Sequence, residues 1–445
     1  MKYNKALLQL LVCISLFAPA LLRAQEQPGD STLQTATLQQ CINYALKNQP
    51  AVKQSLIDEE IGERDINSAL SGWLPQVNAT GSLNDNIKRQ VMAFEGQTRT
   101  IGTKYTSALG VQASQQILNA GLIQASRTAK WYRQQYKQGT QNTRINTVVD
   151  VSKAYYDILT SQEQLKITDE NIARLQKQLK DAYAQYEGGL VDKTDYKRAQ
   201  ISLSNSYADK KRISELLKYK YSYLKQLMGY PAEKQLELIS ASSNMETEAF
   251  VDTTQQLNYR NRVEYQLLET QRKLQGINTS YNKLAYLPSL AANYNYNYNY
   301  LNDKFADLYD RHFPSSVAGL TLSIPIFQGT YRIQQIRRSQ LQERRIDLDL
   351  LNTKNQIFSQ YEAALATYKA NLNDWKTASQ NVELSRDVYN TIKLQYNEGI
   401  KTYLELMTAE TDLRTTQINY LNALYSLLSS KLDLQQALGT ITTQQ

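Results

Sequence analysis

Hydrophobic and aromatic residues recur every three or four positions along two long stretches of the chain. From residue 148 to residue 186, nine of twelve positions at this spacing are apolar or aromatic, and the same holds from residue 358 to residue 396. A repeat of 3.5 residues is typical of helices that pack as left-handed coiled coils. Neither stretch contains a proline, so we predict continuous helices over 121–187 and 331–397, each on the order of 100 Å long.

A second pattern, strict alternation, marks residues 293–300, where asparagine and tyrosine take turns. Successive side chains of a β-strand point to opposite faces. One face therefore carries the tyrosines, which are Tyr294, Tyr296, Tyr298 and Tyr300, and the other carries the asparagines. Aromatic residues outward and polar residues towards water are typical of a barrel strand. Taken alone, the segment also fits an ordinary exposed strand or a low-complexity tract.

Two β-hairpins, 76–118 and 289–327, are predicted, each with its strands joined by a polar loop. Their strands are 76–88 and 103–118 in the first hairpin, and 289–301 and 315–327 in the second. The fold class that follows is a mixed α and β protein.

Shorter helices flank the hairpins and the long helices. A helix of about 35 residues, 38–73 or 252–286, precedes each hairpin and ends at a Leu-Pro pair, because proline disfavours a helical residue before it. Helices 192–228 and 402–438 follow glycine-containing turns, and glycine suits the end of a helix. Two such helices laid end to end match one long helix. We therefore predict antiparallel pairs in which one partner is split.

The two halves of the chain repeat one another. At a shift of 210, Asn171, Gly189 and Gly229 recur as Asn381, Gly399 and Gly439, and at a shift of 213, Asn48 and Pro75 recur as Asn261 and Pro288. Glycine and proline matching at one near-constant shift indicates an internal duplication. The predicted division is 25–230 for the first structural repeat, 231–251 for an equatorial connection, 252–438 for the second repeat and 439–445 for a tail.

Residues 1–24 are predicted to be a secretory signal peptide. Lys2 and Lys5 precede an apolar stretch from Ala6 to Leu22, as such signals require. The formal charge of +8 falls to +5 without this segment, and the remaining charges of both signs are interspersed. We therefore expect an exported protein that does not bind nucleic acid.

Cysteine and histidine are too scarce for several kinds of site. Cys13 falls in the predicted signal peptide, which leaves Cys41 as the one remaining cysteine, and His312 is the one histidine of the chain. An internal disulfide, a Cys/His zinc site and a catalytic triad that needs a second histidine are thus excluded.

Four strands are too few to close a barrel around water, because even a filled barrel needs about eight. Oligomerisation must supply the others, and a trimer would provide twelve strands. Closure would also remove the unpaired strand edges, which lipid does not tolerate.

The whole pattern resembles the TolC family, the outer-membrane factors of tripartite export systems. The resemblance rests on the duplicated plan, on Leu-Pro before each hairpin, and on Ile-Pro-Ile-Phe-Gln-Gly at 324–329 with a weaker partner at 116–121. It rests also on Tyr-x-x-Gly at both far turns, beginning at Tyr186 and Tyr396. It implies a homotrimer with a twelve-stranded outer-membrane β-barrel, four strands per protomer, continued by a periplasmic α-helical coiled-coil barrel.

The same resemblance implies partners and a passive role. The channel would be the exit duct of an efflux or secretion system, joined through a periplasmic adaptor to an inner-membrane transporter of the RND or ABC type. It would lie in outer-membrane lipid of a Gram-negative-type cell, and carry out no reaction, with no cofactor and no metal. Drug efflux and protein secretion remain equally open.

The family's periplasmic gate carries over onto the two far turns. Tyr396 would be linked to Asp195, and Lys401 to Thr194, although lysine in place of the family's frequent arginine loses a bidentate contact. Glu405 matches one acidic ring, whereas Thr408 occupies the position of a second. The expected adaptor contacts are Gly189, Leu190, Gly399 and Ile400.

Threefold symmetry would crowd the carboxylates of Asp195 and Glu405 around the axis. Like charges held close together raise one another's pKa and favour bound cations. The alternative is that both are solvated charges on exposed helix turns, and that the glycines only cap helices. For the whole protein the alternative is a periplasmic or surface coiled-coil scaffold without a pore.

Overall fold

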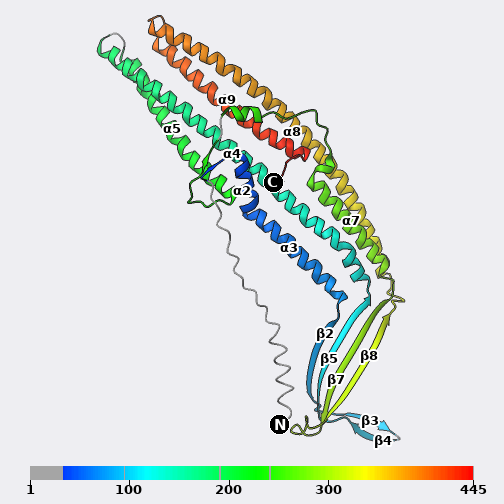
Figure 1. The fold of residues 1–445 in the computed structure, drawn as a ribbon. Helices are drawn as coiled ribbons and strands as arrows, with labels where there is room; N and C mark the ends of the chain where they lie inside the picture. The colour runs from blue at the N-terminus through cyan, green and yellow to red at the C-terminus, as the bar shows by residue number, and fades with distance from the viewer. Residues whose placement is uncertain (1–33, 95, 190–191, 240–241, 444–445) are drawn as a thin grey trace.

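The computed structural model describes residues 34–94, 96–189, 192–239 and 242–443, so the predicted signal peptide lies outside the described residues. The molecule is a long, bent rod (Figure 1). A β-sheet forms one end. Two helical hairpins form the other, and they contain the far ends of the long helices α4 (Ala120–Glu187) and α8 (Tyr331–Asn397). The expectation of a mixed α and β fold is confirmed.

The sheet has four antiparallel strands in the order β2-β5-β7-β8. Their bounds are Gln76–Asp85, Tyr105–Leu118, Ser289–Asn302 and His312–Ser323. Pairing of β5 with β7 joins the two predicted hairpins into one sheet, which leaves β2 and β8 at its edges.

The register gives the whole sheet two different faces. The tyrosines of β7 share their face with apolar residues of the neighbouring strands, since Tyr296 lies opposite Val111 and Val111 lies opposite Ala79. The asparagines share theirs with polar residues, since Asn295 lies opposite Gln112 and Gln112 opposite Asn78. The alternation seen in one segment of the sequence therefore extends across several strands.

The expected polar loop of the first hairpin contains a hairpin of its own. Strands β3 (Gln90–Phe94) and β4 (Gln97–Ile101) pair with each other and project from the far end of the sheet (Figure 1). Asp303, in the β7–β8 connection, holds its base, because one carboxylate oxygen accepts from Arg89 Nη1 at 3.0 Å and from the Lys104 backbone at 2.9 Å. These two strands within the polar loop were not predicted.

The helices pair as one continuous partner with one split partner. Helices α3 (Pro50–Leu70) and α5 (Lys193–Met228) pack along α4, while α7 (Val263–Leu284) and α9 (Tyr403–Leu438) pack along α8. Between the tips and the middle of the rod, α9 also lies against α4 and joins the two hairpins. Along the rod, α8 is at one edge, and α3 and then α5 are at the other (Figure 1).

Two of the expected helix boundaries were wrong. The helix expected over 38–73 is divided into α2 (Leu38–Asn48), α3 and the short 3₁₀ turn η1 (Ser71–Trp73). Pro50 occupies the first turn of α3, where its missing N–H costs nothing, and Gln49 before it is extended. The helix expected over 252–286 begins only at Val263, after the 3₁₀ turn η2 (Tyr259–Asn261).

The split in each pair is closed by a glycine in the left-handed conformation. Gly229, with φ 65°, ends α5 against the backbone of Asn48, and a Cβ there would lie 2.6 Å from the Asn48 carbonyl oxygen. Gly439, with φ 71°, ends α9 against Asn261, whose carbonyl carbon would be 2.9 Å away. Only glycine combines this backbone angle with so close an approach.

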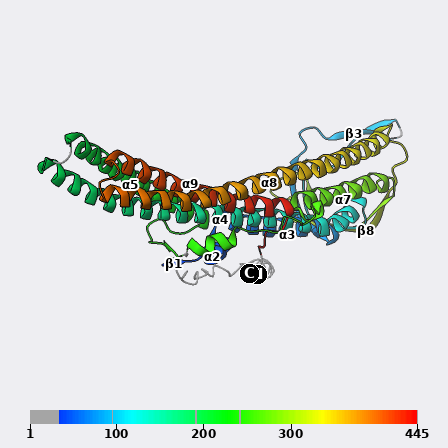
Figure 2. The same ribbon diagram turned by 90° about the horizontal axis from the view of Figure 1, so that it is seen from above.

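The main hydrophobic core lies at the middle of the rod, where the connection between the halves crosses the helices. This connection contains β6 (Glu237–Leu238), which pairs with β1 (Thr35–Ala36), and α6 (Ser242–Glu248). Figure 2 shows β1 and α2 on one side of the rod at this level. Tyrosine hydroxyls of the long helices form hydrogen bonds with this connection. Tyr155 donates to the Ile239 carbonyl at 2.9 Å, and Tyr368 to the Ala249 carbonyl at 3.2 Å.

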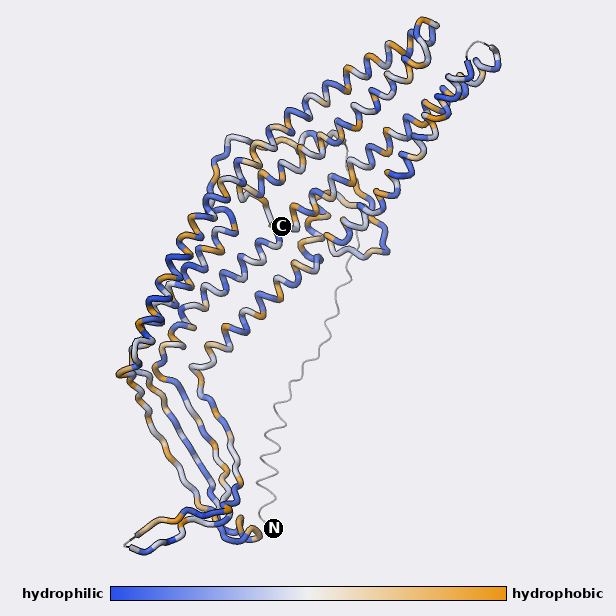
Figure 3. The backbone as a smooth tube through the Cα atoms, turned by 180° about the vertical axis from the view of Figure 1, so that it is seen from behind, coloured by the Kyte–Doolittle hydropathy of each residue, from blue (hydrophilic) through white to orange (hydrophobic). Residues whose placement is uncertain are grey.

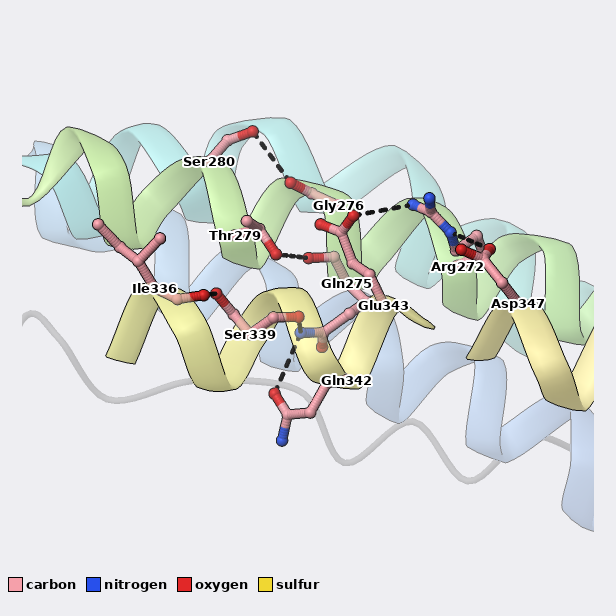
Figure 4. A network of polar contacts seen from close by, with 10 residues as sticks. All are labelled: Arg272, Gln275, Gly276, Thr279, Ser280, Ile336, Ser339, Gln342, Glu343 and Asp347. Atoms are coloured by element: carbon pink, nitrogen blue, oxygen red, sulfur yellow. Dashed lines mark hydrogen bonds and ion pairs between the residues drawn. The ribbon is translucent and has the colours of Figure 1, made fainter. Parts of the chain in front are cut away.

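Polar side chains hold α7 against α8 between the core and the sheet (Figure 4). Arg272 of α7 lies 2.7 Å from Asp347 and 3.5 Å from Glu343 of α8. One turn further, the Gln275 amide donates to the Ser339 carbonyl at 3.2 Å and to Gln342 at 3.1 Å. These contacts fix the rotation of one helix against the other.

Hydrophilic and hydrophobic residues are interspersed along the helices (Figure 3). Among the described residues, no helix has a stretch apolar enough and long enough to cross a membrane.

Candidate functional site: the two far turns

The first far turn joins α4 to α5. Gly189 has φ 72° and ends the turn that follows Glu187, while Leu190 lies outside the described residues. Asp192 caps α5, and its carboxylate accepts from the Thr194 backbone at 3.1 Å and from the Thr194 hydroxyl at 3.2 Å. The Thr194 hydroxyl thus donates to the residue that caps the N-terminus of α5.

The second far turn joins α8 to α9. Gly399 has φ 74°, and Ile400 after it is 71% exposed. Thr402 and Glu405 form a capping box, in which the Glu405 carboxylate accepts from the Thr402 backbone at 2.9 Å. Its other oxygen lies 2.6 Å from Lys401 Nζ. Lys401, in the turn just before α9, is therefore paired with Glu405 in the first turn of that helix.

The carboxyl group of Glu405 is stabilised as an anion. Hydrogen bonds from Lys401, and then from the Thr402 backbone and hydroxyl, lower its pKa to about 2. Crowding around a threefold axis was expected to raise this pKa. Within one protomer the effect has the opposite sign, because a cation and the start of a helix stabilise the charged form of Glu405.

The structure brings Tyr396 and Asp195 into the same neighbourhood. Burial raises the pKa of the half-buried Tyr396, a hydrogen bond with Gln185 opposes this, and the Asp195 charge adds to the rise. Asp195 also acts on Tyr403, whose pKa burial raises to about 12, and the Tyr396 and Tyr403 rings are 6.1 Å apart. Two tyrosines of the second turn therefore lie within electrostatic range of an acid of the first.

Sequence reasoning missed a buried ionic contact behind the turns, which we call the Glu410 cluster (Arg174, Gln178 and Glu410). Glu410 of α9 is 3% exposed. Its carboxylate accepts from Arg174 Nε at 3.0 Å and from Gln178 Nε2 at 2.7 Å, and both donors belong to α4. A charged residue beside Ala409 on an otherwise apolar seam is a signal in the sequence, but nothing in the sequence names its partners.

Other contacts between the hairpins are polar as well. Arg414 of α9 lies 3.1 Å from Asp209 of α5, and Lys153 of α4 lies 2.6 Å from Asp433 of α9. The two hairpins are therefore joined by hydrogen bonds and ion pairs as well as by the main apolar core, and the α8–α9 hairpin has a small apolar core of its own, Tyr389, Leu406 and Leu413. In the described part of the chain, no three His, Cys, Asp or Glu residues are grouped to hold a metal ion.

Comparison with known proteins agrees with this geometry. The family model described as "Outer membrane efflux protein" matches residues 41–230 and 255–440. The outer membrane protein TolC of Vibrio cholerae is 23% identical over 424 residues, which cover 93% of each chain. The outer membrane efflux protein BepC of Brucella suis is 24% identical over 450 residues, which cover 97% of this chain and 92% of BepC.

Solved structures share the fold. CusC, whose structures concern folding and transmembrane channel formation, superimposes with a TM-score of 0.73 at 15% identity, over 93% of this chain and 95% of that one. The outer membrane protein VceC of Vibrio cholerae gives a TM-score of 0.72 at 14% identity, over 90% and 96%.

Proposed function

We propose that this chain, which belongs to the outer membrane efflux protein family, assembles as three copies into one passive duct. The protein is an efflux channel of the outer membrane. In the proposed assembly, three four-stranded sheets close a twelve-stranded barrel, and the helices continue it as a tube with a closable end. Solutes would enter at the far turns and leave through the barrel, without any chemical reaction.

The observation that carries this proposal is a two-faced sheet with two unpaired edges. One face is apolar and aromatic over Val77, Val111, Tyr296 and Leu320, and the other is polar. In lipid, unpaired backbone groups at the edges β2 and β8 would cost several kcal/mol each, so the sheet must close. Pairing of β8 with β2 of the next copy satisfies both edges, and four strands cannot do this alone.

The helices at the edges of the rod support the same arrangement. Helix α8 exposes large apolar residues along one side, and α3 exposes others, because no described part of the chain covers them. The residues are Leu341, Leu348, Leu351 and Phe358 on α8, and Leu56, Ile57 and Ile61 on α3. Neighbouring copies would cover both stripes and leave no large apolar surface on the tube.

An internal duplication accounts for the equivalence of the two halves. Gly229 meets Asn48 in the first half as Gly439 meets Asn261 in the second. These residues correspond in the sequence at shifts of 210 and 213. The structural repeats 25–230 and 252–438 would therefore have arisen from one ancestral unit, and three copies give a nearly sixfold tube.

The proposed partners are a periplasmic adaptor and an inner-membrane transporter of the RND or ABC type. The exposed Ile400 and the glycine turns at Gly189 and Gly399 offer an apolar, narrow end against which a helical hairpin can pack. Asp195 and Glu405, repeated three times around the axis, would attract cations and narrow the closed end.

Single-channel recording in a planar bilayer tests the duct and its closed end. The wild type should show a small, cation-preferring conductance, and the Asp195→Ala/Glu405→Ala variant a severalfold larger, less selective one. Asp412→Ala, on the exposed side of the same helix α9, is the matched control and should leave the conductance unchanged.

Two results would contradict parts of the proposal. Protein that inserts but never conducts would favour a scaffold without a pore. If the double variant and the wild type had the same conductance, the protein would still be a duct, but Asp195 and Glu405 would not form its gate.

A further inference from the structure

The polar face of the sheet carries no charged side chain over its whole length. Asp85, at the end of β2, is the one Asp, Glu, Lys or Arg in the four strands, and it lies on the tyrosine face beside Tyr105. The other charges at this end of the sheet, among them Lys104, Asp303 and Arg311, lie in the connections beyond the strands. The polar face consists mainly of amides and hydroxyls: Gln76, Asn78, Thr80, Ser82, Asn84, Thr106, Gln112, Ser114, Asn293, Asn295, Asn297, Asn299, Ser315 and Thr321.

Several of these amides are hydrogen-bonded to side chains of the neighbouring strand. The Asn293 amide donates to the Thr321 hydroxyl at 2.9 Å, and the Asn299 amide to the Ser315 hydroxyl at 3.3 Å. Both bonds join β7 to β8, so the asparagine side chains lie along the sheet instead of standing away from it. Each amide still has hydrogen-bonding capacity that can be offered to water or to a solute.

Gly110 makes room for a third amide. A Cβ at this position would lie 2.1 Å from Asn297 Oδ1, closer than any real contact. The Asn297 side chain therefore lies over the β5 backbone, which only glycine leaves uncovered at this point. The whole tract presents a flat, hydrogen-bonding wall.

We infer that this wall makes the barrel a charge-neutral exit, which passes polar solutes of either charge and leaves charge selection to the far turns. The inference rests on the proposed trimeric barrel, in which the polar face lines the duct. The ten residues of β2 span about 33 Å. Charges at either end are screened over about 8 Å at physiological ionic strength, so the middle of the barrel has no fixed charge within reach.

Thiol labelling from outside measures this directly. In an Asn295→Cys variant, the rates of reaction with a cationic and an anionic methanethiosulfonate reagent are compared with those of a free thiol in solution. The cation-to-anion ratio should match the free-thiol ratio within about twofold, because no local potential favours either reagent. Adding Asn297→Asp, about 7 Å along the same face, should raise the ratio about fivefold. The Ser315→Cys variant places the thiol on β8, and its cation-to-anion ratio should match the free-thiol ratio in the same way.

The controls separate this inference from the proposed function. Tyr296→Cys, on the apolar face, should not react in membranes, and the wild type is the blank, since Cys41 is fully buried. Equal labelling at positions 295 and 296, or labelling at neither, contradicts the barrel itself. If only position 295 is labelled and its cation-to-anion ratio differs from the free-thiol ratio by more than about twofold, the barrel stands and the neutral exit is overturned.

Discussion

At the scale of single residues, Glu410 shows how the two helical hairpins are held together. It is the one buried acid in the described part of the chain. Its partners Arg174 and Gln178 both come from α4, so the contact links the first half of the molecule to the second. A buried carboxylate is stable only while these donors stay in place. The Glu410 cluster therefore resists separation of α9 from α4.

Glu410→Gln should destabilise the protein by about 2–4 kcal/mol per copy, because the Arg174 guanidinium loses its anionic partner in a largely buried place. Thermal unfolding followed by circular dichroism measures the loss. Glu215→Gln is the control, since Glu215 pairs with Lys211 and Lys218 on the exposed surface of α5, and it should have little effect.

Replacing both members tests whether the loss comes from the unpaired charge. The Arg174→Leu/Glu410→Leu variant should be more stable than Glu410→Gln, because apolar residues of similar size can replace a buried ion pair at little cost. A double variant that is less stable than Glu410→Gln would contradict this interpretation.

At the scale of helices and turns, glycines with the same backbone angle have different roles. Gly399 and Gly439 have φ 74° and 71°, but a Cβ would meet nothing within 4 Å at Gly399, whereas at Gly439 it would lie 2.9 Å from Asn261. The first needs glycine only for its angle. The second needs it also for the close approach of two helix ends.

Gly399→Ala should therefore cost about 1 kcal/mol, the price of a left-handed alanine, and Gly439→Ala clearly more. Unfolding of both variants by heat, under the same conditions, gives the comparison. If the two variants were equally stable, the junction between α9 and Asn261 would not be tightly packed as described.

Strong periodicity allowed the long elements to be predicted. Helix α8 begins and ends where the sequence indicated, and α4 begins one residue earlier, because each long stretch without proline runs from a hairpin to a glycine turn. The break at Gln49 was missed although Pro50 signals it, because proline also fits the first turn of a helix and the apolar pattern continues on both sides of it. The small hairpin β3–β4 was missed because its strands are short and alternate weakly.

The site was less predictable than the fold. The sequence contains the capping box of Thr402 and Glu405 and the i, i+4 spacing of Lys401, and these local contacts satisfy the lysine. A link from Lys401 to Thr194 has to compete with them. Contacts between helices, such as Arg174 with Glu410, depend on how two helices are rotated against each other, and no short pattern encodes that rotation.

At the scale of the whole molecule, one chain is an incomplete object. It has a sheet with two free edges and a rod with apolar stripes on α3 and α8. The unpaired strand edges and the exposed apolar stripes lie on the same two sides of the chain. One neighbouring copy on each side can therefore pair the edge and cover the stripe together. A closed ring of identical copies provides that neighbour on each side.

Native mass spectrometry of the protein extracted from membranes in mild detergent tests the trimeric barrel most directly. One dominant species that contains three copies is expected, because twelve strands are what close the barrel. A conducting monomer or dimer would contradict the trimeric barrel.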